Sequence, residues 1–295
     1  MKKLTSFFSL LAVLSLACAI QTNVPTQQPE QPNVATFVAA TLAAITTPQA
    51  PPPASPLPPA SPLPPTETKA PVPNGKSVTV GNTSFVIPNG LAAAASGAQI
   101  PAADEQNAAP WDVAPAHLEI TLDGYPSQGS MFHPKIYVYP ALEYATAHQG
   151  AAESIKRLQA ILANPSSATK DNLPTVPFYN AAQMFASQIN TLKFQGGAGV
   201  RMVTAYGQAA GPITKDITFY HFEGLTSDNK YFIIAILPIQ SPSESVSFPG
   251  YEAQAASLEQ YYNGVTATLN SAAPENFTPN LTALDALIQS IQVTP

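Results

Sequence analysis

The chain is poor in charge and has a single cysteine. Charged side chains make up 10% of its 295 residues, and 18 acidic residues against 12 basic ones give a formal charge of -6. Without a cluster of lysine and arginine, the chain lacks the concentrated positive charge that binding to nucleic acid or to an anionic lipid surface requires. A lone cysteine cannot close an internal disulfide. We therefore expect no nucleic-acid partner, and membrane attachment only through hydrophobic groups.

Motifs for metal binding and for catalysis are missing as well. No two histidines are four residues apart, as helical metal ligands often are, and no cysteine or carboxylate completes a zinc pattern. The Gly-x-Ser-x-Gly turn of many serine hydrolases does not occur. The sequence therefore predicts neither a metal site nor a cofactor. The histidines are His117, His133, His148 and His221.

The first 17 residues have the form of a secretory signal. Lys2 and Lys3 give a short basic start, and residues 4–17 are apolar apart from one threonine and the serines. This apolar stretch is too short to cross a bilayer core, which needs about 20 residues. We therefore expect an exported chain whose leader, residues 1–17, is removed.

The end of the leader, Leu14-Ser15-Leu16-Ala17-Cys18, resembles the bacterial lipobox, in which a small residue precedes the cysteine. Serine stands here where leucine is commonest. The resemblance implies that the thiol of Cys18 receives a diacylglyceryl group and that the chain is cleaved before it. Each buried methylene of such a lipid adds about 0.8 kcal/mol of membrane affinity.

Cleavage before Cys18 would remove two lysines, so 10 basic and 18 acidic residues would leave a charge of -8. We expect a lipid-anchored protein on the cell membrane or outer membrane, facing outside the cytoplasm. An ordinary cleaved signal followed by a chance cysteine is the alternative.

Residues 18–75 have the composition of a linker. Between residues 48 and 73 proline dominates, and Ala-Ser-Pro-Leu-Pro-Pro at 54–59 is repeated at 60–65. Proline removes a backbone donor and favours an extended polyproline II conformation over a packed core. At about 3.1 Å per residue, such a tract reaches roughly 80 Å. The sequence predicts a disordered spacer; recognition of the prolines by a partner is the less favoured interpretation.

Residues 76–295 have the pattern of a single α+β domain. Blocks of strands and helices follow one another, which favours a mainly antiparallel sheet packed against helices. Residues 231–237 are apolar on both faces, as in a central strand. We expect Thr278 to cap the last helix and Pro279 to begin it. The expected strands are 77–88 (two, around a Gly-Asn turn), 117–123, 135–139, 200–206, 217–223 and 230–239; the expected helices are 151–162, 180–192, one near 258–269 and one from 279 to 291.

Several stretches of this domain resemble a group of uncharacterised bacterial lipoproteins. They are residues 194–201 (Phe-Gln-Gly-Gly-Ala-Gly-Val-Arg), 220–226 and 277–291. The final helix, 284–291, is also similar to the closing helix of PsbP-like domains. Neither resemblance implies a catalytic residue, because the first group has no assigned function and the second covers only the tail.

Two polar patterns allow a functional or a structural interpretation. The glycines of 196–199 allow a phosphate-cradling loop, but a helix-to-strand turn that needs positive φ is favoured. His117, Glu119 and Asp123 share one face of a strand. Acid–base chemistry is one interpretation of that face, and a solvated sheet surface is the simpler one.

The most promising polar cluster is Arg201, His221 and Glu223. His221 and Glu223 share a strand face, and Arg201 lies on an expected neighbouring strand. A structural ion pair is the favoured interpretation, and a catalytic site of dispersed polar residues, as in a hydrolase, is the alternative. Several aromatic residues gather on the expected sheet, where an uncovered face would offer a groove for an apolar ligand or a protein partner. They are Tyr206, Phe219, Tyr220, Phe222, Tyr231 and Phe232.

The sequence therefore favours a membrane-anchored, non-enzymatic binding or assembly module. An extracytoplasmic enzyme remains the second hypothesis. The two differ in one respect: an enzyme needs Arg201, His221 and Glu223 to converge in an accessible cleft.

Overall fold

The computed structural model describes residues 73–126, 129–177 and 179–294. The leader, Cys18 and the proline-rich stretch lie outside these described residues. Within them, no helix is both long and apolar enough to cross a bilayer.

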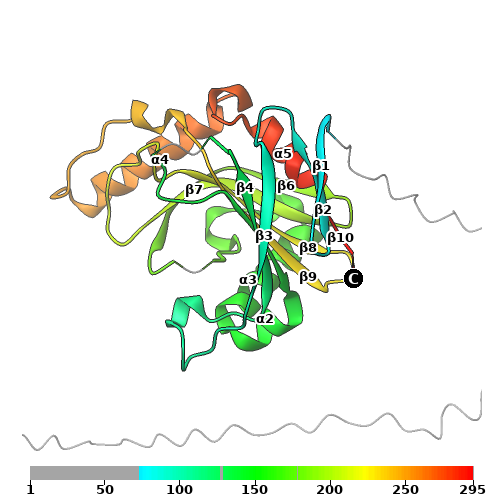
Figure 1. Ribbon diagram of the computed structural model, residues 1–295. Helices are drawn as coiled ribbons and strands as arrows, with labels where there is room; N and C mark the ends of the chain where they lie inside the picture. Colours follow the sequence, from blue (N-terminus) through cyan, green and yellow to red (C-terminus); the bar gives the residue numbers. More distant parts are fainter. Residues whose placement is uncertain (1–72, 127–128, 178, 295) are drawn as a thin grey trace, which may run out of the picture. The chain divides into compact units, whose positions relative to one another are not determined.

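An antiparallel sheet of seven strands forms the centre of the α+β domain (Figure 1). In spatial order its strands are β3 (Ala94–Ile100), β4 (His117–Asp123), β5 (Lys135–Pro140), β9 (Tyr231–Pro238), β8 (Phe219–Thr226), β7 (Gly197–Gly207) and β6 (Ala182–Phe194). A small second sheet joins β1 (Gly75–Val80), β2 (Thr83–Pro88) and β10 (Gln292–Val293).

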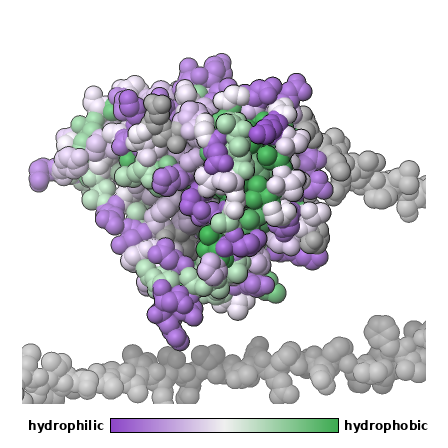
Figure 2. Space-filling view, in the orientation of Figure 1, coloured by the Kyte–Doolittle hydropathy of each residue, from purple (hydrophilic) through white to green (hydrophobic). Residues whose placement is uncertain are grey.

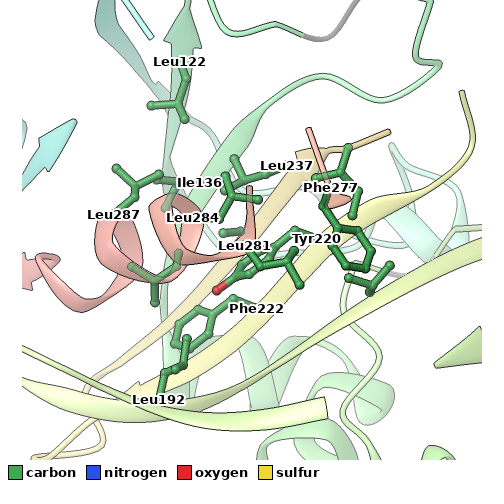
Figure 3. Close-up of a cluster of buried hydrophobic side chains, with 14 of the residues drawn as sticks. Leu122, Ile136, Leu192, Tyr220, Phe222, Leu237, Phe277, Leu281, Leu284 and Leu287 are labelled. Atoms are coloured by element: carbon green, nitrogen blue, oxygen red, sulfur yellow. The ribbon is translucent and has the colours of Figure 1, made fainter. Parts of the chain in front are cut away.

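Helices cover both faces of the large sheet. On one face, which we name the α5 face, lie α4 (Ala255–Ser271) and α5 (Leu281–Gln289); on the other, the α3 face, lie α2 (Ala141–Ala147) and α3 (Gln149–Ala163). Figure 3 shows the leucines of α5 packed towards Tyr220 and Phe222 of the sheet. Each fully buried leucine contributes roughly 1.5–3 kcal/mol, so this stripe fixes α5 against the sheet.

β9 is the middle strand of the seven, as its apolar sequence predicts. Its odd-numbered residues 233, 235 and 237 enter the core of the α5 face, and its even-numbered residues 232, 234 and 236 enter that of the α3 face. Both sides of the strand are therefore packed against helices.

The surface of the domain is mixed in polarity. In the space-filling view of Figure 2, hydrophilic residues are spread over the surface, and apolar residues form a narrow band near β3.

The prediction of a helix over 180–192 is wrong, because the residues form β6. Phe185, Ile189 and Leu192 have helical spacing, yet the first and last face α5 while Ile189 packs on the α3 face. Two register shifts interrupt the pairing of β6 with β7, and Gln188 has a positive φ of 52° within the second. These bulges break the two-residue alternation of a strand and leave a pattern that imitates a helix.

The N-cap of the last helix also differs from expectation. Asn280 caps α5, and its side chain accepts a hydrogen bond from the Ala283 amide at 2.7 Å. Thr278 instead exchanges backbone hydrogen bonds with Gln240, which hold it in an extended bridge. The strand expected over 117–123 is present as β4 with the same ends. The other expected helices and strands are present with shifted ends, and β3, α2 and β10 are additional elements.

Candidate functional site

The structure brings only two of the three residues in the polar cluster together. Arg201 of β7 pairs with Phe222 of β8, and directly paired residues project to the same face of a sheet. Arg201 therefore faces α5, while His221 and Glu223 face α3. The expectation that all three meet is wrong, since the register of β7 and β8 places the arginine on the opposite side.

Arg201 belongs to a structural network. Its Nε lies 3.2 Å from Asp285 Oδ1 on α5, and its Nη1 donates to the Gln188 carbonyl in the β6 bulge. The Tyr220 hydroxyl donates to the same Asp285 oxygen at 2.8 Å. Burial raises the pKa of Asp285, and Arg201 opposes that shift. These contacts connect the irregular part of β6 to α5.

His221 and Glu223 form a buried pair that is held by the backbone of one residue, Val176. His221 Nε2 lies 2.7 Å from the Val176 carbonyl and 3.2 Å from Glu223 Oε1, so this nitrogen carries a hydrogen. The Val176 amide donates to the same carboxylate oxygen at 2.8 Å. The segment before Pro177 therefore clamps the imidazole and the carboxylate together.

This pair is closed to solvent. The exposed fraction of the side chain is 1% for His221 and 0% for Glu223. The other ring nitrogen, His221 Nδ1, and the other carboxylate oxygen, Glu223 Oε2, are buried and have no hydrogen-bond partner among the described residues. Burial raises the pKa of Glu223, and the hydrogen bond from His221 is the strongest opposing effect. A catalytic pair would need access to substrate, which this arrangement does not give.

A pocket of about 350 Å³, which we name the tyrosine pocket, adjoins this pair. Two lining residues connect the pocket to the pair. The pKa of Tyr144 is raised mainly by burial and also by Glu223. Pro177 directly follows Val176, whose amide donates to Glu223. The pocket is lined by Trp111, Asp112, Ala114, His117, Tyr137, Tyr139, Tyr144, Pro177, Tyr179 and Asn180.

Local strand geometry stacks the rings of this pocket. Tyr137 and Tyr139 alternate on one face of β5, and His117 begins the adjacent strand β4. The His117 and Tyr139 ring centroids are 4.2 Å apart, and those of Tyr139 and Tyr144 are 4.4 Å apart. Trp111, in the short 3₁₀ helix Pro110–Asp112, is 40% exposed. The pocket thus has a packed floor and an accessible tryptophan.

The tyrosine pocket has no unpaired positive side chain in its described lining. None of the described residues that line it is a lysine or an arginine. Burial lowers the pKa of His117, so its ring is largely neutral at neutral pH. Glu119 is paired with Lys135 at 2.8 Å. Burial raises the pKa of all four tyrosines in the lining, which therefore keep their hydroxyl protons.

A second, more apolar pocket of about 460 Å³ shares Tyr179 and Asn180 with the first. Phe132, Met184 and Tyr206 are among its lining residues. The buried Tyr206 hydroxyl has no hydrogen-bond partner among the described residues, and the Glu223 charge contributes to raising its pKa. The buried carboxylate is thus electrostatically coupled to a tyrosine in each pocket.

The glycines of 196–199 belong to a hairpin between β6 and β7, so the expected helix-to-strand turn is wrong. None of the three glycines has a positive φ. Gly199 is required for close packing instead: an added Cβ would lie 2.3 Å from the Glu223 backbone oxygen and 2.4 Å from the Phe222 ring. A pocket of about 430 Å³ beside the hairpin has Lys193 as its one basic lining residue among those described. The strand-to-strand connection gives it no helix N-terminus for phosphate.

The polar face of β4 is also structural in its contacts. Glu119 pairs with Lys135, and Asp123 accepts a hydrogen bond from Ser96 of the edge strand at 3.1 Å. His117 Nδ1 lies 2.9 Å from the Pro115 carbonyl. Among the residues that the structure describes, no three His, Cys, Asp or Glu side chains are grouped to hold a metal ion.

The sequence interpretation missed the tyrosine pocket. Its residues come from a 3₁₀ helix, two strands, an α-helix and the loop around Pro177, so no local motif unites them. The available signals were the Tyr-x-Tyr pattern at 137–139 and a single tryptophan. A scan against protein-family models and searches of curated proteins and of solved structures found no match to this chain.

Proposed function

We propose that this chain is a lipid-anchored protein outside the cytoplasm, whose folded domain binds a small ligand in the tyrosine pocket without transforming it. The leader and Cys18 support the anchor, and the proline-rich stretch supports a spacer between anchor and domain. A role in assembly with a partner protein is the other form of the binding hypothesis.

The observation that carries the proposal is the contrast between the pocket and the buried pair. The pocket combines aromatic rings with a few polar groups, as ligand sites commonly do, and it has a suitable volume. The best acid–base pair, His221 and Glu223, lies behind this wall without solvent access, and Arg201 is engaged elsewhere. The tyrosine pocket therefore offers a binding site, while the expected cluster of Arg201, His221 and Glu223 offers no accessible set of catalytic groups.

The anchor is tested by the mass and location of Cys18. Intact mass spectrometry of protein extracted from membranes should give the chain from Cys18 onward with a diacylglyceryl group. A Cys18→Ser variant should leave the membrane fraction. An unmodified thiol, or a serine variant that stays in the membrane fraction, would overturn the anchor.

Ligand binding is tested through Trp111, the only tryptophan of the chain. Its emission should change saturably with at least one probe among choline, its uncharged analogue 3,3-dimethylbutan-1-ol, and cellobiose. Emission that stays constant with all three in folded protein, together with an unchanged melting temperature, would contradict binding in this pocket.

A further inference from the structure

We infer that the tyrosine pocket selects an organic cation, an ammonium group carried on a small molecule. This inference rests on the proposed function, because it names the class of ligand for the same pocket. It is carried by the charges and rings that surround the pocket.

The electrostatic environment favours a positive ligand. Asp112 contributes an exposed carboxylate to the lining. The nearby Lys135 is engaged by Glu119, and the ring of His117 is largely neutral at neutral pH. An anionic ligand would therefore meet no free positive side chain among the described lining residues.

The aromatic lining supplies a second, independent attraction. Ring faces carry partial negative charge, and a cation within about 6 Å of a ring centre is attracted to it, most strongly by tryptophan. Trp111, Tyr137 and Tyr179 are the lining rings that retain accessible surface. Because the phenols remain protonated, the rings attract through their faces and their hydroxyls can orient the ligand.

A neutral sugar would use this lining less well. Aromatic rings stack on sugars, but each sugar hydroxyl also needs a hydrogen-bonding partner when it is buried. The described lining offers one carboxylate and one side-chain amide, those of Asp112 and Asn180, beside the hydroxyls and His117. Charge complementarity therefore favours the cation.

The test compares choline with 3,3-dimethylbutan-1-ol, which has the same shape without the charge. Isothermal titration calorimetry with the purified full chain should give one site for choline, with an affinity about 10-fold or more above that of the neutral analogue. Equal affinities would overturn the cation inference while leaving the binding function intact. If the protein binds cellobiose but not choline, the cation inference is likewise overturned and the binding function is left intact.

Substitutions of Tyr137 distinguish the attraction between its ring and choline from an effect on folding. Tyr137→Leu should lower choline affinity by about 2- to 30-fold, whereas Tyr137→Phe, which keeps the ring, should change it much less. Tyr251→Leu is the matched control, because Tyr251 is 74% exposed and does not line the pocket. Equal losses in the leucine and phenylalanine variants of Tyr137, with unchanged melting temperatures, would contradict ring attraction.

The carboxylate is tested in the same way. Asp112→Asn should weaken choline binding and reduce its dependence on salt, while leaving the neutral analogue unaffected. Glu259→Gln on α4, which covers the other face of the sheet, is the control and should change neither. A choline affinity unchanged by Asp112→Asn would remove the charge argument.

Discussion

Replacing His221 with leucine should destabilise the domain in a way that depends on pH. The substitution removes the ring from Glu223 and leaves the Val176 carbonyl without its donor at 2.7 Å. Breaking a buried pair by removing one partner costs about 3–5 kcal/mol. In a Glu223→Gln background no charge is left behind, so the cost should fall to roughly 1–3 kcal/mol for the orphaned carbonyl.

The direction of the pH effect follows from the carboxyl group. Burial raises the pKa of Glu223 above its ordinary 4.5, and the His221 contact opposes this. A raised carboxyl pKa gives stability that is fully present below 4.5 and is lost as the pH rises through the folded-state pKa. Removing His221 takes away the opposing contact, so its cost should be smallest near pH 4 and largest near pH 8.

Urea denaturation of four proteins between pH 4 and pH 8 measures this effect. The proteins are the wild type, His221→Leu, Glu223→Gln and the double variant. The free energy of unfolding should show a coupling between the two sites that grows with pH. A cost of His221→Leu that is constant over this range, or equal in both backgrounds, would refute the electrostatic account of the pair.

Three further changes test the packing by urea denaturation. Gly199→Ala should cost about 1–3 kcal/mol, because the new Cβ would press on the Glu223 backbone oxygen and the Phe222 ring. Gly196→Ala enters open space and should be nearly neutral. Asn280→Ala removes the N-cap of α5 and should cost about 0.5–2 kcal/mol. Arg201→Met should cost about 1–3 kcal/mol, since it leaves the partly buried Asp285 of α5 with the Tyr220 hydroxyl but without its ion pair. A neutral result at any of the three would show that the contact assigned to it carries no stability.

The regular parts of the fold are readable from the sequence because one period dominates them. Strict alternation at 117–123 predicts β4, and the helical stripe at 281–291 predicts α5. β6 could not be predicted in this way, because its bulges change whether the odd-numbered or the even-numbered residues face a given side of the sheet. Nor could β3, because an edge strand of alanine, serine and glycine buries little apolar surface.

The candidate site was less accessible to sequence reasoning. The i, i+2 spacing of His221 and Glu223 correctly places them on one face of β8. The position of Arg201 depends on the register between β7 and β8, and the connection of residues 208–218 is too long for a turn rule to define it. Trp111 and Tyr179 meet the tyrosines of β5 only through tertiary folding.

Two-dimensional NMR shows at which residues a ligand binds. The single tryptophan gives one indole N–H signal in a two-dimensional NMR spectrum of the full chain, and choline is the probe. If choline binds in the tyrosine pocket, this signal and those of Tyr137 and Tyr179 should shift saturably, while those of the hairpin glycines at 196–199 should not. Shifts confined to the hairpin, or no shifts at saturating choline and at saturating 3,3-dimethylbutan-1-ol, would contradict ligand binding in this pocket.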